Sequence, residues 1–307
     1  MQAFLTGAYP HSEELVAAHR EHARKRITKE ELNKAVGKDL EVLIRLQKVE
    51  GFKQIVDGQL DWGDLLRPFL KLYGIEKGSL TRWYNNNTFY WAPRVTGKIE
   101  WKDSVLKGSL SPNANKLIVP GPYTFSLLCE TSFYRNRDEI MFDFAKALNS
   151  ELKHHKVPYI QISEPSLVFS PPDENTLEKS IDAVAEAIKG IKAQTFLQTY
   201  FGPIEPIYPA VLEYPVDFIG IDFIETDVNA LDSGFAKGLA CGLVNSRTSS
   251  IEKPEDIAEK ANNIEEKLEP KEAFICPNAD LDLRPRWVAE KKIASLASAS
   301  KIIGELA

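Results

Sequence analysis

Eight short runs rich in β-branched and aromatic residues recur along the chain, separated by long amphipathic or charged segments. This alternation is typical of repeated strand–helix units, which assemble into a parallel sheet with helices outside it. The expected strands are Ala3–Gly7, Phe52–Asp57, Lys116–Pro120, Tyr159–Ser163, Thr195–Tyr200, Phe218–Phe223, Leu239–Asn245 and Ala273–Pro277. Nearly all of them end in or next to Gly, Pro, Asn, Asp or Glu, as strands do where they run into loops.

Six of the intervening segments have the length and pattern of helices. They are Ser12–Arg26, Lys29–Glu50, Arg137–His155, Asn175–Lys189, Pro254–Leu268 and Pro285–Ile303. Thr28 with Glu31 three residues later is a capping-box pattern, and Pro254 stands at an early helical position. Eight strand–helix units in 307 residues predict an α/β fold, a TIM (β/α)8 barrel, with its site at the C-terminal strand ends. We expect one domain over residues 1–307.

The segment Leu80–Leu110, between the second and third expected strands, does not follow the alternation of strands and helices. Its later part alternates in hydrophobicity, which predicts a β-hairpin laid over the barrel mouth. Its aromatic residues are Trp83, Tyr84, Phe89, Tyr90 and Trp91. They would pack the hairpin onto the barrel or stack on a flat ligand ring, with Arg82 and Arg94 near for a carboxylate. We favour packing, because a long loop needs a small core of its own.

Charge and cysteine usage exclude several classes of protein. A net charge of −6, with Lys and Arg dispersed through the expected helices, argues against a nucleic-acid surface. The three cysteines have neither paired nor CxxC spacing, so we expect no disulfide framework or zinc ribbon and a cytoplasmic protein. We expect no signal peptide, because the apolar run at the N-terminus is too short for one, and no apolar stretch approaches the roughly 18 residues that span a bilayer.

Several strand-end motifs are shared with one known family. Thr-Gly-Ala-Tyr-Pro at Thr6–Pro10, Val-Pro-Gly-Pro-Tyr-Thr-Phe at Val119–Phe125 and Gln-Ile-Ser-Glu-Pro-Ser-Leu at Gln161–Leu167 resemble segments of the cobalamin-independent methionine synthases. These enzymes move a methyl group from methyltetrahydrofolate to homocysteine. Their full-length members consist of two tandem barrels, an N-terminal one without metal and a C-terminal catalytic one. The resemblance covers almost the whole chain.

Three further segments resemble the N-terminal barrel. Leu80–Tyr90 is similar to its Met-Thr-Lys-Trp-Phe-Asp-Thr-Asn-Tyr-His-Tyr, Thr199–Gly202 to its Thr-Tyr-Phe and Leu243–Arg247 to its Val-Asn-Gly-Arg. Gln54–Gln59 is nearer to the catalytic barrel's Asp-Gly-Glu element. The resemblance therefore implies a free-standing, archaeal-type relative of both halves.

The residues that hold zinc in the catalytic barrel are largely replaced. A His-x-Cys pair, a glutamate and a late cysteine bind the metal there, and the matching positions here are Gln198, Tyr200, Glu225 and Ala279. A catalytic zinc needs three protein ligands and an open position, so the resemblance implies no bound metal. Cys241 and Cys276 lie on neighbouring expected strands and could approach each other, but a free cysteine is usually a small buried hydrophobe. Asp57-Gly58-Gln59 and Ser163-Glu164-Pro165 also lack two of the family's homocysteine-binding carboxylates.

The expected ligand site comprises polar and aromatic residues at the strand ends and on the hairpin. They are Trp83, Tyr84, Arg94, Glu164, Gln198, Tyr200, Asp222, Glu225, Asn245, Arg247 and Arg284. They form either an internally satisfied polar network or a pocket for an anionic or amide-rich ligand. In the second case Arg247 and Arg284 would bind a carboxylate, and Glu164 or Glu225 would face an amine or a pterin edge.

Three functions remain open. The first is a zinc-free component of methionine synthesis that binds a methyltetrahydrofolate-type methyl donor and works with a separately encoded catalytic barrel. The second is an independent methyl or alkyl transferase on the same fold, because a fold does not fix a function. The third is a non-catalytic binding or scaffold protein. We expect the first, with a small molecule as ligand and neither nucleic acid nor membrane as partner.

Overall fold

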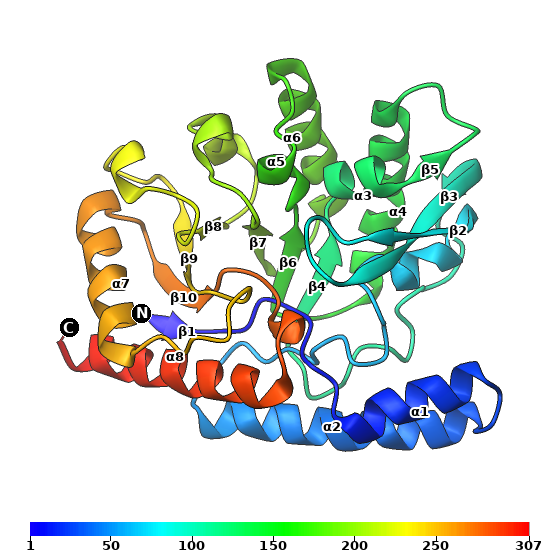
Figure 1. The fold of residues 1–307 in the computed structure, drawn as a ribbon. Helices are drawn as coiled ribbons and strands as arrows, with labels where there is room; N and C mark the ends of the chain where they lie inside the picture. Colours follow the sequence, from blue (N-terminus) through cyan, green and yellow to red (C-terminus); the bar gives the residue numbers. More distant parts are fainter. Residues whose placement is uncertain (307) are drawn as a thin grey trace.

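The computed structural model describes residues 1–306 and contains a curled parallel sheet of seven strands, in the order β1-β10-β9-β8-β7-β6-β4 (Figure 1). The strands are β1 (Gln2–Ala3), β4 (Lys116–Pro120), β6 (Tyr159–Ser163), β7 (Gln194–Gln198), β8 (Phe218–Asp222), β9 (Gly238–Val244) and β10 (Ala273–Pro277). Helices surround the sheet, so the α/β barrel expected from the sequence is confirmed. Seven of the eight expected strands form.

The prediction of a strand at Phe52–Asp57 was wrong, because this segment forms no regular strand. It nevertheless occupies the position in the barrel that the second strand would take. Ile55 O accepts hydrogen bonds from the backbone N of Asn115 (2.9 Å) and Lys116 (3.1 Å), and Tyr9 N donates to Gly58 O (3.0 Å). The segment therefore fills the gap between β1 and β4 with few ladder bonds. Asp57 Oδ1 accepts from Gln59 N at 3.0 Å, a local turn that competes with regular strand pairing.

The six expected helices all form, with ends that shift by a few residues. They are α1 (Glu13–Ala23), α2 (Lys29–Val49), α4 (Arg137–His154), α6 (Glu174–Ile188), α7 (Pro254–Leu268) and α8 (Arg286–Leu306). Shorter helices are α3 (Pro122–Leu128), α5 (Ser166–Phe169), η1 (Arg67–Lys71), η2 (Glu205–Ile207), η3 (Ala210–Glu213), η4 (Val228–Ala230) and η5 (Leu281–Leu283). At the start of α2, Thr28 Oγ1 accepts from Glu31 N (3.2 Å) while Glu31 Oε2 accepts from Thr28 N (2.7 Å), which is the predicted capping box.

The hairpin between the barrel strands also forms, but it begins earlier than expected. β2 (Tyr73–Arg82) pairs antiparallel with β3 (Phe89–Glu100), and β3 pairs parallel with β5 (Glu130–Thr131). The first strand was missed because only Ile75 in it is buried, so it shows little alternation in hydrophobicity. The turn between the two strands carries Trp83 and Tyr84 toward the barrel.

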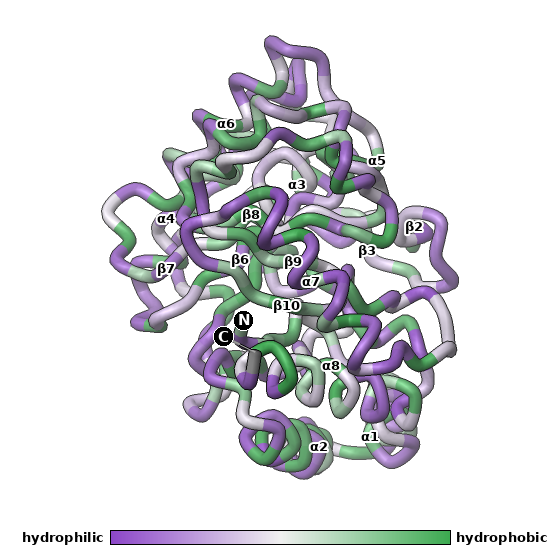
Figure 2. Tube along the Cα trace, turned by 90° about the vertical axis from the view of Figure 1, so that its left-hand side faces the viewer, coloured by the Kyte–Doolittle hydropathy of each residue, from purple (hydrophilic) through white to green (hydrophobic). Residues whose placement is uncertain are grey.

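The sheet separates two apolar regions, and Figure 2 shows apolar residues along its strands and hydrophilic ones recurring along outer helices such as α7. Inside the barrel, Phe196 stacks on Phe218 (4.5 Å between ring centroids), and Phe4 and Phe274 pack edge-on against Phe196. The Lys116 amine lies 3.3 Å from the centroid of the Phe4 ring. Among the described residues, no helix has both the length and the apolar character needed to cross a membrane.

Candidate functional site

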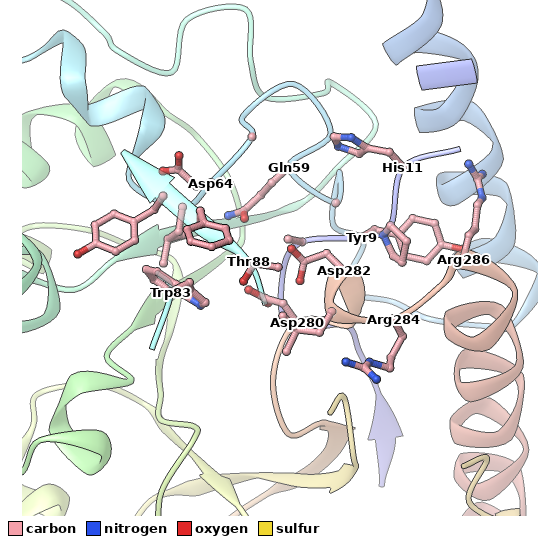
Figure 3. A pocket seen from close by; sticks show the side chains of 18 of the residues that line it. Tyr9, His11, Gln59, Asp64, Trp83, Thr88, Asp280, Asp282, Arg284 and Arg286 are labelled. Atoms are coloured by element: carbon pink, nitrogen blue, oxygen red, sulfur yellow. The ribbon is translucent and has the colours of Figure 1, made fainter. Parts of the chain in front are cut away.

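A cavity of about 360 Å³ opens between the hairpin and the loops that follow β1 and β10 (Figure 3). Its polar and aromatic lining residues come from five segments: Tyr9 and His11; Gln59 and Asp64; Trp83, Thr88, Phe89 and Tyr90; Phe201; and Asp280, Asp282, Arg284 and Arg286. This volume suits a small organic ligand. The position is the C-terminal end of the parallel strands, where barrels of this architecture carry their sites.

Two carboxylates from the loop after β10 face the cavity. Asp282 N donates to Ala8 O at 3.3 Å, which ties this loop to the segment after β1. The carboxylate of Asp280 lies against Gly7, where a Cβ would collide with Oδ1. Burial and the neighbouring charge of Asp282 raise the pKa of Asp280 well above its usual value. Within residues 1–306 no cation forms an ion pair with either group, so burial and the charge of Asp282 favour the protonated form of Asp280.

Most other charged groups on the cavity are neutralised by neighbours. Arg67 donates to Asp64 Oδ2 through Nε (3.0 Å) and Nη2 (2.8 Å). Arg286 lies 2.9 Å from Asp39 Oδ2. Burial and the nearby His19 lower the pKa of His11 to about 4, so its imidazole is uncharged at neutral pH. Arg284 differs, because its Nε is buried without a partner in the described part of the chain.

Gln59 is a polar side chain on the cavity that the protein leaves partly unsatisfied. It is 7% exposed, its Nε2 has no hydrogen-bond partner, and Figure 3 shows its amide directed into the cavity. A buried polar atom without a partner costs roughly 1 to 3 kcal/mol. Such an atom on a cavity wall is therefore available to a ligand.

Aromatic rings form the side of the cavity that the hairpin contributes. Trp83 packs edge-on against Tyr84 and Tyr90, with centroids 4.9 Å and 5.6 Å away. Phe89 remains 49% exposed at the rim. Tyr84 lies behind this wall, where its hydroxyl and Ser166 Oγ share a 2.7 Å hydrogen bond. Trp83 and Tyr84 thus hold the hairpin on the barrel, whereas Phe89 is half exposed, with the Arg82 guanidinium 5.9 Å from its ring centroid.

Backbone strain gathers at the same place. Three of the five non-glycine residues with positive φ lie on or beside the cavity: Gln59 (φ 52°), Tyr84 (φ 48°) and Phe201 (φ 73°). A side chain in this region of backbone space costs on the order of 1 kcal/mol and persists only where the surroundings enforce it. Strain of this kind clusters at functional sites.

Of the residues expected from the sequence, Trp83 and Arg284 line the cavity, whereas Gln198 and Tyr200 are buried and do not line it. Tyr200 packs edge-on against Phe201 (4.7 Å between centroids), and the charge of Asp280 acts on it. Gln198 is fully buried and neither atom of its amide group has a partner. These two residues belong to the polar upper layer of the barrel interior.

Glu164 and Asp222 are buried carboxylates that bind protein donors. Glu164 accepts from the backbone N of Tyr123 (2.9 Å) and Thr124 (2.7 Å) at the start of α3, and burial raises its pKa to about 7. Asp222 accepts from Asn278 Nδ2 (3.1 Å) and Phe201 N (3.2 Å), and burial raises its pKa to about 6. Glu164 therefore anchors α3, and Asp222 fixes the strained backbone of Phe201.

The remaining expected residues lie outside the cavity lining. The Arg247 guanidinium is 4.7 Å from the centroid of Phe201 and 3.6 Å from Glu225 Oε1. Asn245 Oδ1 accepts from Arg247 N at 2.9 Å. Arg94 pairs with Glu130 (3.0 Å) on the exposed face of the hairpin. Arg247 therefore does not line the cavity itself, but it packs against Phe201, which does.

Sequence reasoning missed several residues that line the cavity: Tyr9, Gln59, Asp64, Asp280 and Asp282. For Asp280 and Asp282 a signal existed, because both closely follow the eighth expected strand. For Gln59 a signal also existed, because it closely follows the second expected strand and stands where the resemblance places a homocysteine-binding carboxylate.

The residues at the family's zinc positions do not fit that metal. Gln198, Tyr200 and Ala279 are buried and are not zinc ligands in proteins, and Glu225 pairs with Arg247. Cys241 and Cys276 do not rebuild a site, because Cys241 packs in the outer core and Cys276 in the inner one. Throughout residues 1–306, no three His, Cys, Asp or Glu side chains are grouped as metal ligands would be.

Comparisons with known proteins agree with this architecture. Residues 75–269 match the model of the family described as cobalamin-independent synthase, N-terminal domain. The methionine synthase of Saccharolobus solfataricus is 27% identical over 97% of this chain and 93% of its own length, and that of Sulfolobus acidocaldarius is 26% identical over 97% and 91%. A structure of the B12-independent methionine synthase from Shewanella sp. W3-18-1 in complex with selenomethionine superposes with a TM-score of 0.82 at 18% identity, covering 98% of this chain and 97% of that one.

Proposed function

This chain belongs to the cobalamin-independent methionine synthase family, and from that premise we propose that it is a zinc-free member that binds a methyltetrahydrofolate-type methyl donor in the cavity. It would act together with a separately encoded catalytic barrel, which supplies the metal and the methyl acceptor. We treat residues 1–307 as one barrel domain, because Phe89 of the hairpin and Asp280 of the barrel line the same cavity. Three free, buried cysteines support a reducing, cytoplasmic setting.

The observation that carries this proposal is that Asp280 and Asp282 line the cavity without a cation partner among the described residues, so that the negative charge that the pair keeps at neutral pH is not neutralised. A nearby negative charge raises the pKa of a thiol, because it disfavours a second anion. Only the thiolate is an effective nucleophile, so an acceptor thiol in this cavity would stay in its unreactive form. The cavity thus favours binding of a methyl donor over activation of homocysteine.

The other groups on the cavity suit such a donor. The exposed ring of Phe89 offers a surface for stacking a flat heterocycle. Arg284 supplies a guanidinium with an unpartnered Nε, which can bind the carboxylate of a glutamate tail. A folate-type molecule presents both a flat ring and such a carboxylate.

A second candidate is an independent methyl or alkyl transferase. Relatives named methionine synthase have nearly the length of this chain, which covers 93% of the Saccharolobus solfataricus protein. The Shewanella relative holds an amino acid, selenomethionine, so a free-standing barrel of this fold can bind one. In this case the chain alone would transfer the methyl group.

A methyl-transfer assay separates the two. We expect no methionine from 5-methyltetrahydrofolate and homocysteine with this chain alone, with or without added zinc. Addition of the chain to a zinc-loaded catalytic barrel of the same family should raise the rate several-fold. Turnover by the chain alone would favour the second candidate. No effect in either assay, together with no donor binding, would leave a scaffold role.

A further inference from the structure

The tip of the hairpin, residues 83–88 between β2 and β3, borders the cavity and is closed on itself by backbone hydrogen bonds. Trp83 N donates to Thr88 O at 2.9 Å, and Asn86 N donates to Trp83 O at 3.1 Å. Trp83 and Thr88 line the cavity, and Figure 3 shows both of them beside it. We call residues 83–88 the strap. Its internal bonds allow it to move as one piece.

The strap is attached to the barrel through one residue, Tyr84. The Tyr84 hydroxyl and Ser166 Oγ on α5 share a hydrogen bond of 2.7 Å. The Tyr84 ring packs against Phe169, also on α5, and against Phe201, which follows β7, with centroids 4.8 Å and 5.7 Å away. Among the residues that the structure describes, no other side chain of the strap forms a hydrogen bond or an ion pair with the barrel.

The base of the hairpin is held at several points. β3 pairs with β5, and Arg94 of β3 lies 3.0 Å from Glu130 of β5. Farther along β3, Ile99 N donates to the hydroxyl of Tyr134 at 2.8 Å. A segment that is fixed at its base and attached at its tip by one residue can swing about the residues between them.

The closed position of the strap also retains unfavourable features. Tyr84 has a φ of 48°, in the left-handed region that disfavours residues with a side chain. Within residues 1–306, Asn86 Nδ2 and Thr88 Oγ1 are buried without a hydrogen-bond partner. Both atoms would bond to water if the strap lifted, and a buried polar atom without a partner is costly. The contacts of Tyr84 have to offset these costs, so the closed position is weakly held.

We propose that the strap opens and closes over the cavity and that Tyr84 is its latch. In the open position the Tyr84 ring leaves Phe169 and Phe201, and the side chains of Asn86 and Thr88 reach water. The side of the cavity that the strap forms then opens, which gives a ligand its path in and out. A molecule that bonds to Thr88 Oγ1 in the closed position would favour closure. This inference does not depend on which ligand the cavity binds.

Labelling of a buried thiol measures the movement without a ligand. Asn86 is 9% exposed, so Asn86→Cys places a thiol that a reagent such as iodoacetamide reaches only when the strap moves. We expect this thiol to react about 3- to 10-fold faster when Tyr84→Phe is added, because that substitution removes the hydrogen bond to Ser166 and keeps the ring. Peptide mass spectrometry of the full chain measures the rate for each cysteine separately.

Two controls separate movement of the strap from loosening of the whole protein. Tyr214→Phe removes the same kind of bond, between the hydroxyls of Tyr214 and Ser180, outside the cavity lining, and should leave the rate at position 86 unchanged. Cys241 is fully buried in β9 and reacts only when the barrel unfolds, so its rate should stay far below that at position 86.

Two results would overturn the proposal. An equal rate at position 86 with and without Tyr84→Phe would show that Tyr84 is not a latch. A rate at position 86 no higher than that of Cys241 would show that the strap moves only when the whole barrel unfolds.

Discussion

The carboxylate of Asp280, after the last strand, rests directly on the Cα of Gly7, after the first. Gly7 has no positive φ, so its backbone would tolerate a side chain and only Asp280 forbids one. The contact fixes one corner of the cavity, above the point where the first and last strands of the chain pair side by side.

Gly7→Ala should displace Asp280 and alter the cavity. We expect 5-methyltetrahydrofolate affinity to fall at least 10-fold and the unfolding free energy to drop by about 1 to 3 kcal/mol, the usual cost of overpacking. The control is Gly37→Ala in α2, where a Cβ meets nothing within 4 Å and alanine should stabilise the helix by about 0.5 to 1 kcal/mol. Unchanged ligand affinity in folded Gly7→Ala would remove Asp280 from the site.

Phe89→Ala should weaken donor binding by about 0.5 to 1.5 kcal/mol, the scale of an aromatic stacking contact. Its melting temperature should stay near that of the parent, because Phe89 is 49% exposed. Phe133→Ala is the matched control, since Phe133 is 52% exposed and does not line the cavity. Trp83→Ala is less informative, because Trp83 also holds the hairpin. Equal affinities for Phe89→Ala and Phe133→Ala would place the ligand ring elsewhere.

Lys116→Met should stabilise the protein by about 1 to 3 kcal/mol at pH 7, because it removes a buried amine without a hydrogen-bond partner. Burial lowers the pKa of Lys116 well below its usual value, so the unfolded chain binds a proton that the folded one does not. Stability of the parent should therefore rise with pH from 7 toward about 9.5, and this rise should shrink in Lys116→Met. Urea unfolding of the two proteins at several pH values measures both the difference in stability at pH 7 and the change of stability with pH. A destabilised Lys116→Met would indicate a charged amine held by the aromatic rings.

Glu151 anchors the segment after β3 to α4. Its carboxylate accepts from Trp101 Nε1 (2.7 Å), Ser104 Oγ (2.6 Å) and Val105 N (2.9 Å), and it contacts His155 Nε2 (2.8 Å). Burial alone would raise its pKa, but these hydrogen bonds outweigh burial and lower it to about 2.

The stabilisation from Glu151 should therefore be complete above its unfolded pKa near 4.5 and disappear as pH falls toward 2. A shift of this size corresponds to on the order of 3 kcal/mol at neutral pH. Glu151→Gln should lose about that much at pH 7, roughly half of the difference should remain at pH 3, and its stability should approach that of the parent near pH 2. A constant difference between the two proteins from pH 7 to pH 3 would contradict this account.

The barrel could be predicted because each strand is a short apolar run and each helix has its own start signal. The strand predicted at Phe52–Asp57 does not form. Its composition favours a strand, but composition does not reveal the turn that Asp57 makes with Gln59. The rule that strand ends carry the site located its general position. It could not show which way a loop side chain points. Glu164 and Asp222 turn inward to backbone and amide donors, whereas Asp280 and Asp282 turn to the cavity.

The most direct test of a zinc-free methyl-donor site is titration of 5-methyltetrahydrofolate into the full chain before and after treatment with a chelator. We predict one molecule bound per chain, the same affinity and melting temperature in both preparations, and at least 10-fold weaker binding in Asp282→Asn. Absence of binding, or binding that is lost with the metal and restored by added zinc, would contradict the account.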